Sequence, residues 1–238
     1  MKAEKQFVEK LNKAMIEDFV AVNKKRNPIA KNLAKDMKAL QYVIGQYSIF
    51  PKNIVSFLEF AKNKAKEMNW KNVEEEIIRN MGEELGSKSN GITHYDLLVN
   101  GVKEELGLDI SNIQISESTK NFIESMKSIL SNKNPYYIMG ATYALEDSAV
   151  PELALVVEWV SHLFIEITGK PIQDKTLKFF FDMHLGVWEP GHEEGLRNTV
   201  FEKISSEEDR DNFEAGFREV LKTMDFWWNG LYNEASQN

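Results

Sequence analysis

The sequence contains only four histidines, and three of them lie near acidic residues at spacings that suit a metal site carried by helices. Carboxylate oxygens and imidazole nitrogens suit iron and manganese, and helical bundles build di-iron sites from inward-facing Glu and His side chains. The chain has no cysteine, so a thiolate zinc site is excluded. The candidate metal ligands are Glu84, His94, Glu146, His184, Glu189 and His192.

Each candidate also has an ordinary interpretation. A glutamate near a helix end, such as Glu84, is usually solvated, and a lone histidine such as His94 is more often a surface or capping residue than a ligand. Glu146 is followed by further acidic residues, which is typical of an exposed face. The metal-site hypothesis therefore depends on the joint occurrence of these residues along one chain. The fourth histidine, His162, fits no place in it, and we interpret His162 as a core or rim residue.

Composition and charge exclude several classes of protein. A net charge of −8 and an isoelectric point near 5.2 argue against binding to nucleic acid, whose phosphates attract clustered Lys and Arg. The absence of cysteine excludes disulfides and cysteine nucleophiles. No stretch reaches the roughly 18 uncharged apolar residues of a membrane span, because the richest, 153–167, contains Glu158 and Glu166. The charged first residues argue against a secretory signal, so we expect a cytoplasmic protein.

The elements that must position these residues are helices. Apolar residues recur at helical spacing through most of the chain, and six prolines and 13 glycines mark the breaks. The expected helices cover 3–24, 29–49, a segment opened by Pro51, 70–86, 92–106, 116–131, 135–168 with a bend near Pro151, 173–187, 191–204 and 207–228. Gly86 suits the end of the fourth of these. Because no strand or repeat is apparent, residues 1–238 predict one all-α domain, a bundle of roughly eight or nine helices.

The order of the candidate ligands resembles that of the haem-oxygenase-like di-iron oxidases and oxygenases, a family that includes many iron-containing redox enzymes and the chlamydial protein that associates with death domains. Members typically carry Asn-x-x-x-Glu-x-Gly, a His about ten residues later, a mid-chain Glu, and then His-x-x-x-Asp-x-x-His. Over about residues 40–200, the matching positions here are Asn80, Glu84, Gly86, His94, Glu146, His184, Glu189 and His192.

The resemblance implies a haem-oxygenase-like bundle that holds two iron ions, with manganese as the alternative metal. One iron would be held by Glu84, His94 and His192 or its neighbour, and Glu146, His184 and Glu189 would complete the pair. Haem oxygenases bind haem through a His on an early helix, and no His precedes His94 here, so no haem is expected. Thiaminase-like members of the fold use a cysteine nucleophile, which this chain lacks.

The chain departs from the family pattern at Glu189, which stands where Asp is usual and follows His184 by five residues instead of four. On a regular α-helix five residues turn a side chain by about 140°, away from the face that carries His184. A π-type turn or a helix break between Leu185 and Pro190 would restore the alignment, and Pro190 has no N–H to lose.

The leading hypothesis is a metal-dependent oxidase or oxygenase whose partners are O2 and a small organic substrate. Candidate pocket aromatics are Tyr47, Tyr143, Phe179–Phe181 and Trp188, although ordinary core packing is the commoner role for such residues. The alternative is an interaction module that keeps the helical scaffold and binds a protein partner, with partial or no metal. The cluster 226–228 (Phe-Trp-Trp) suits core packing or the interface of a homodimer better than such a partner surface.

Overall fold

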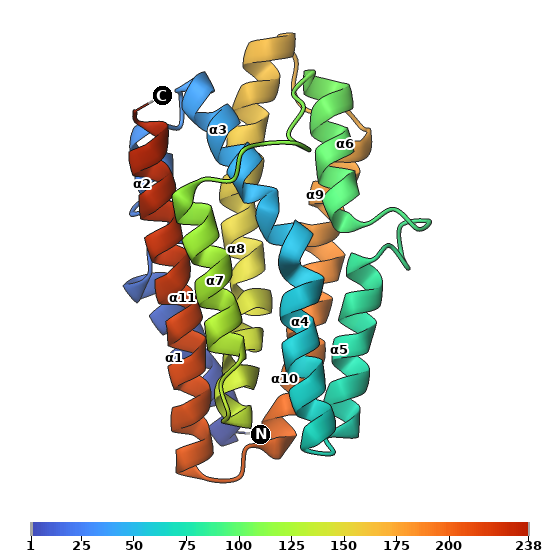
Figure 1. Cartoon of the computed structure of the whole chain (residues 1–238), viewed down its shortest axis with the longest axis vertical. Coiled ribbons are helices and arrows are strands. Elements are labelled where there is room, and N and C mark those ends of the chain that lie inside the picture. The colour runs from blue at the N-terminus through green and yellow to red at the C-terminus, as the bar shows by residue number, and fades with distance from the viewer. Residues whose placement is uncertain (1, 238) are drawn as a thin grey trace.

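The structure is a computed structural model that describes residues 2–237, and its helices lie side by side along the long axis of the molecule (Figure 1). The helices are α1 (Lys2–Asp18), α2 (Pro28–Asn32), α3 (Met37–Tyr47), α4 (Ile49–Glu67), α5 (Lys71–Glu84), α6 (His94–Leu106), α7 (Glu117–Leu130), α8 (Pro135–Thr168), α9 (Thr176–Met183), α10 (Glu189–Val200) and α11 (Glu207–Ala235). A π-helix, His184–Trp188, joins α9 to α10, and a short 3₁₀ turn, Phe201–Lys203, follows α10.

Residues 2–237 contain no strand, so the all-α prediction is confirmed. If α9, the π-helix and α10 are counted as one continuous helix and the five-residue α2 is left out, these residues form nine helices, as expected. Buried apolar side chains from every helix, α1 to α11, belong to one connected core.

The expected helix over 3–24 was too long, because α1 ends at Asp18. Two backbone N–H groups just beyond it, those of Val20 and Ala21, donate to the carboxylate of Asp225 on α11 at 2.8 Å. Arg26 then reaches back to the carbonyl of Asp18 at 3.2 Å. These contacts give the chain alternatives to helical hydrogen bonds and turn it out of the helix.

The expected helix over 29–49 is divided into α2 and α3. Asn27 caps α2, and its side-chain oxygen accepts from the backbone N–H of Ile29 at 3.0 Å. Asp36 caps α3 in the same way, accepting from the N–H of Ala39 at 3.1 Å. A capping residue in the middle of an apolar pattern starts a new helix, because its side chain replaces the missing intrahelical partner.

The centre of the fold is α8, which packs against α11, α10, α4 and α3 and continues through Pro151 without interruption. Two glycines let α8 and α11 approach closely. A Cβ on Gly140 would overlap the carbonyl of Phe213, and one on Gly216 would overlap the carbonyl of Tyr137. The most apolar 18-residue window of α8 has a mean hydropathy of 1.4, enough to cross a membrane by composition, but half of that window is buried inside the protein. Because α8 packs against four other helices and contributes to the connected core, we interpret it as the core helix of the bundle.

Candidate metal centre

The structure brings the six predicted ligands together from four parts of the chain. Glu84 is the last residue of α5, His94 is the first of α6, and Glu146 lies in the first half of α8. The other three lie in the π-helix and the start of α10. All six are buried, at 8% exposure or less, so none has the solvated or surface position that the ordinary interpretation predicts. They are Glu84, His94, Glu146, His184, Glu189 and His192.

One half of the cluster is centred on His94. Its Nδ1 atom lies 3.1 Å from Oε2 of Glu84 and 3.1 Å from Nε2 of His184. The Nδ1 atom of His184 donates to the carbonyl oxygen of Phe180 at 2.6 Å, because a carbonyl can only accept. Nε2 of a neutral His184 therefore presents its lone pair to the cluster. The imidazole of His94 is held by Trp188, which stacks on it with 4.1 Å between ring centroids.

The other half is centred on His192. Its Nδ1 atom lies 3.2 Å from Oε2 of Glu146 and 3.8 Å from Oε2 of Glu189. The other oxygen of Glu189, Oε1, lies 4.0 Å from Nε2 of His184. Glu189 therefore stands between the two halves with one oxygen toward each. Ligand atoms of Glu84, Glu189 and His192 all lie within 4.8 Å of one another, which places Glu84 at the boundary as well.

These contacts group the histidines differently from the division that the resemblance implies. His184 lies with His94 and Glu84, and His192 lies with Glu146. The convergence itself is as the sequence predicts. His94 and His192 do not point to opposite surfaces, since both are fully buried within one cluster.

The π-helix explains how Glu189 reaches the cluster. The N–H of Glu189 donates to the carbonyl of His184, five residues earlier, and this confirms the predicted π-type turn. A π-turn contains one more residue than an α-turn. Glu189, five positions after His184, therefore lies on the same helix face as His184. A Cβ on Gly186 would meet nothing within 4 Å, so the bulge itself is not crowded at that position.

The turn after α5 brings His94 back beside Glu84. Gly86 has φ of +95°, a conformation that residues with a side chain rarely adopt. A Cβ there would also lie 2.6 Å from the carbonyl oxygen of Ile92. Thr93 then caps α6 by accepting from the N–H of Asp96 at 3.0 Å. Glycine at 86 therefore permits the tight return, and the cap fixes where His94 begins the next helix.

The electrostatics of the cluster favour a cation. Burial lowers the pKa of His192, but the facing carboxylates of Glu146, Glu189 and Glu83 outweigh it and raise that pKa well above its usual value. Burial raises the pKa of Glu189 to about 7. Burial, with a smaller effect from His94, holds the pKa of His184 well below its usual value, so this imidazole is neutral at neutral pH. A neutral imidazole is the form that binds a metal.

The donor set fits a pair of metal ions. Four glutamates, numbered 83, 84, 146 and 189, are almost fully buried in one place. Buried charges are normally paired or coordinate metals. Arg79 pairs with Glu83, and a protonated His192 is the cation that faces Glu146 and Glu189, so the buried carboxylates still exceed the cations beside them. Two donors bound at right angles to one ion, each about 2.1 Å away, lie about 3 Å apart, close to the separations seen here. Among residues 2–237, both polar side-chain atoms of Asn80 and both ring nitrogens of His192 are buried without a hydrogen bond.

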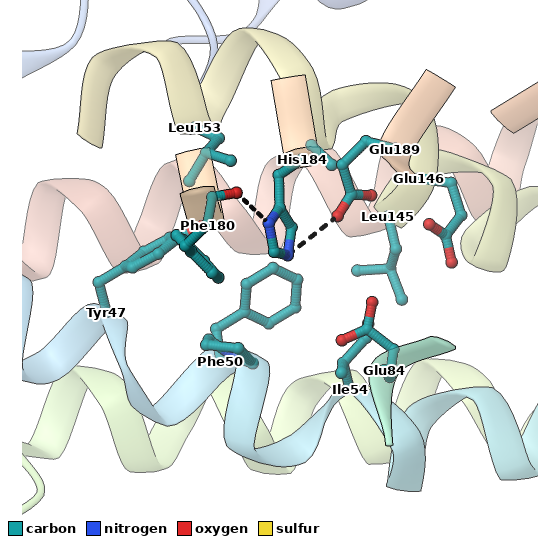
Figure 2. Close-up of a pocket in the computed structure, with 12 residues that line it drawn as sticks. Tyr47, Phe50, Ile54, Glu84, Leu145, Glu146, Leu153, Phe180, His184 and Glu189 are labelled. Carbon is teal, nitrogen blue, oxygen red and sulfur yellow. Dashed lines mark hydrogen bonds and ion pairs between the residues drawn. The ribbon is translucent and has the colours of Figure 1, made fainter. Parts of the chain in front are cut away.

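A small cavity of about 50 Å³ adjoins the cluster. Its polar wall is formed by Glu84, Glu146, His184 and Glu189, which point toward one space in Figure 2. The remaining wall consists of apolar or aromatic residues, Tyr47, Phe50, Pro51, Ile54, Leu145, Ala149, Leu153 and Phe180. This arrangement suits a small apolar molecule, or the end of a narrow one, placed directly against the ligands.

The predicted aromatics divide between cavity and core. Tyr47 and Phe180 line the cavity, and Trp188 packs on His94. Tyr143 lies in the core against Phe213, and Phe179 is 42% exposed. The C-terminal pair Trp227 and Trp228 is buried in the core, next to the exposed Phe226. His162 is half-buried and bonds the carbonyl of Ala34 at 2.8 Å, so it is a rim residue, as expected.

Sequence reasoning missed Glu83, whose Oε2 lies 3.4 Å from Nε2 of His192. Interaction with His192, and then with Arg79, lowers the pKa of Glu83 to about 2 despite its burial. Glu83 and Glu84 are adjacent at a helix end, and the expected ligand pattern used only Glu84. The sequence offered one indication of this role: in the last turn of a helix, Glu83 and Glu84 can both face inward, Glu84 toward His94 and Glu83 toward His192.

Comparison with known proteins agrees with this fold. The sequence matches the DUF3865 family, described as a domain of unknown function with a solved structure, over residues 5–234. Two crystal structures of a CADD-like protein of unknown function from Nostoc punctiforme PCC 73102 are similar to it. One has 36% identity and a TM-score of 0.90 over 99% of both chains. The other has 34% identity and a TM-score of 0.89, covering 100% of this chain and 97% of that one.

A more distant structure shows the fold alone. A TenA homolog from Pseudomonas syringae pv. tomato DC3000 has 14% identity and a TM-score of 0.61, covering 100% of this chain and 92% of its own. No curated protein matches this chain. The fold is thus the helical, haem-oxygenase-like bundle of CADD-like proteins and TenA homologs, and the chain belongs to the DUF3865 family.

Proposed function

We propose that this protein is a metal-dependent oxidoreductase that holds two iron ions, with manganese as the alternative, and uses O2 to oxidise a small organic substrate. The observation that carries the proposal is the buried cluster of three imidazoles and four carboxylates beside an apolar cavity. When bound, such a metal pair supplies redox equivalents and open coordination positions for O2. The family resemblance in the ligand order supports the same conclusion.

The residues of the chain would divide the work as follows. His94, His184 and His192 supply nitrogen donors, and the phenyl and indole rings of Phe180 and Trp188 hold two of these imidazoles in place. Glu84 and Glu189, at the boundary between the two halves, would supply carboxylate oxygens to the metal pair.

The cavity wall would bind the substrate and exclude water. Its apolar side, represented by Phe50, Ile54 and Leu145, suits an alkyl or aromatic group better than a charged one. A volume of about 50 Å³ admits O2 and one end of a narrow molecule, so a larger substrate would have to displace side chains. Excluding water from this space would protect reactive species from hydrolysis or quenching.

A bundle that serves only as a protein-interaction scaffold would not need this cluster. Buried ionic groups are commonly neutral or unfavourable for stability compared with apolar side chains of similar volume. Arg79 pairs with Glu83, and the cost of burying Glu84, Glu146 and Glu189 is explained if they bind metal ions. The interaction-module alternative gives these three carboxylates no role.

The test is O2 uptake by protein loaded with Fe(II) under argon. We expect saturable uptake faster than that of the same concentration of free Fe(II), and loss of most of this uptake in Glu146→Ala. Arg218→Gln serves as the control variant and should behave as wild type, because Arg218 bonds Glu214 and Asp18, which do not belong to the cluster. Uptake no faster than that of free Fe(II), or uptake unchanged in Glu146→Ala, would contradict the proposal.

A further inference from the structure

Three charged residues on α5 form a connected network beside the candidate metal centre. Arg79 Nη1 donates to Oε1 of Glu83 at 2.6 Å, and Arg79 Nε donates to Oε2 of Glu76 at 3.1 Å. The third contact crosses to α10, where Arg79 Nη2 donates to the carbonyl oxygen of Gly191 at 3.2 Å. Arg79 therefore fastens α5 to the backbone immediately before His192.

A glycine on α10 makes room for this network. A Cβ on Gly195 would overlap the carboxylate of Glu76 and lie 3.1 Å from Nη2 of Arg79. Glycine is less favourable than alanine inside a helix, so its use here needs a reason. The carboxylate of Glu76 fills the space that a side chain at 195 would take. Gly195 and Glu76 thus form a notch that holds the guanidinium of Arg79 against α10.

The network ends on His192. Oε1 of Glu83 accepts from Arg79, while its other oxygen lies 3.4 Å from Nε2 of His192. The opposite ring nitrogen, Nδ1, faces Glu146 at 3.2 Å. The imidazole therefore lies between two carboxylates, with Glu146 on the side of the candidate metal space and Glu83 on the other side, close to Nε2 but without a hydrogen bond. In metal-binding histidines a carboxylate on that other side usually fixes the tautomer and orientation of the ring.

We propose that Arg79 is a positioning residue that orients Glu83, and through it His192, for metal binding. This inference rests on the proposed function, because it assigns a role around the same centre. An ordinary surface ion pair would also join Arg79 to Glu76. Such a pair would not require the buried carboxylate of Glu83, the bond from Arg79 to the carbonyl of Gly191, or a glycine at position 195 that leaves room for Glu76.

The first test compares Fe(II) affinity of the full chain under argon by equilibrium dialysis. We expect Arg79→Gln to lower the affinity for one of the two Fe(II) ions about 10- to 100-fold, which is the range found when a residue that supports a metal-bound histidine is replaced. Arg79→Lys should recover part of this loss, since a lysine can reach Glu83 but lacks the planar fork. Arg218→Gln is the matched control, because Arg218 also bonds two carboxylates, those of Glu214 and Asp18, and neither belongs to the cluster.

The second test uses the notch. Gly195→Ala should displace Glu76 and lower the affinity for the same Fe(II) ion. Because alanine favours helix more than glycine does, the helical circular dichroism signal should stay equal or rise. If the displacement of Glu76 is the cause, Gly195→Ala combined with Glu76→Ala should bind Fe(II) as Glu76→Ala does alone. A further loss in the double variant would mean that Gly195→Ala acts through the backbone of α10, and would overturn the role of the notch.

The outcomes separate this inference from the proposed function. If wild type binds two Fe(II) ions and Arg79→Gln binds both with wild-type affinity, Arg79 is only a surface ion pair and the inference fails alone. If wild type binds no Fe(II), the proposed function fails. Thermal melts of the apo proteins give the fold control. If Arg79→Gln melts at a much lower temperature than Arg218→Gln, its loss of Fe(II) binding could reflect instability. The Fe(II) affinities of Arg79→Lys and Gly195→Ala then provide the test. Wild-type affinity in both of these variants would overturn the inference.

Discussion

Glu189 faces His184 across 4.0 Å although it lies five positions later in the sequence, because the N–H of Glu189 donates to the carbonyl of His184 in a π-turn. The turn adds one residue to the helix without rotating Glu189 out of the cluster. The family pattern that the ligand order resembles has a four-residue step here. Relative to that pattern the π-turn accommodates one extra residue while Glu189 keeps its direction toward the cluster.

Deleting one residue of the π-turn should convert it to regular α-helix and keep the cluster. Val187 is the suitable residue, because its side chain is 56% exposed. We expect the deletion variant to bind the same number of Fe(II) ions as wild type, with equal or higher thermal stability, since π-turns are rare and less favourable than α-helix. Deleting the outward-facing Glu194 within α10 is the control and should disrupt folding downstream. Loss of Fe(II) binding on deletion of Val187 would show that the π-turn does more than absorb the extra residue.

The turn between Glu84 and His94 should tolerate no side chain at Gly86. Alanine there would combine a positive φ with an approach of 2.6 Å to the carbonyl of Ile92. We expect Gly86→Ala to lower the unfolding free energy by about 2 kcal/mol or more, measured by urea denaturation. Gly91→Ala is the control, because it also has positive φ, of 81°, but open space around the Cβ, so it should cost about half as much. Equal losses would contradict the role assigned to close packing at Gly86.

A buried glutamate outside the cluster should make stability depend on pH. Glu152 is 1% exposed, its Oε1 accepts from Nε1 of Trp228 at 2.6 Å, and burial raises its pKa to about 8. The folded state therefore favours the protonated form, and the stability from this group is present below pH about 4.5 and is lost as the pH rises to about 8.

Glu152→Gln keeps the acceptor for Trp228 and removes the titration. The unfolding free energy of Glu152→Gln relative to wild type should rise by up to about 1.4 kcal/mol per pH unit between pH 5.5 and 7.5. Urea denaturation of the apo proteins at these two pH values measures the difference, with the solvent-exposed Glu166→Gln on the same helix as control. A difference that does not change with pH would mean that Glu152 is already ionised in the folded protein.

The fold class followed from helical spacing along the chain, and the ligand order of the resembling family pointed to six of the seven buried Glu and His residues that converge. Even the π-turn followed from the distance between His184 and Glu189 in sequence. What could not be predicted depends on contacts between distant segments. The end of α1 at Asp18 depends on Asp225, about 200 residues away, and the notch at Gly195 depends on how α10 lies against α5. The inward direction of Glu83 likewise needs the position of His192.

An anomalous difference map tests most directly whether the cluster binds two metal ions; it would be recorded at the iron absorption edge from crystals of protein loaded with Fe(II) under argon. We expect two peaks, roughly 3.5–4 Å apart, inside the buried cluster. Each peak should lie about 2.0–2.2 Å from nitrogen or oxygen atoms of the cluster. The atoms concerned belong to Glu84, His94, Glu146, His184, Glu189 and His192. A map with no peak in this cluster, or with peaks only on surface carboxylates, would contradict it.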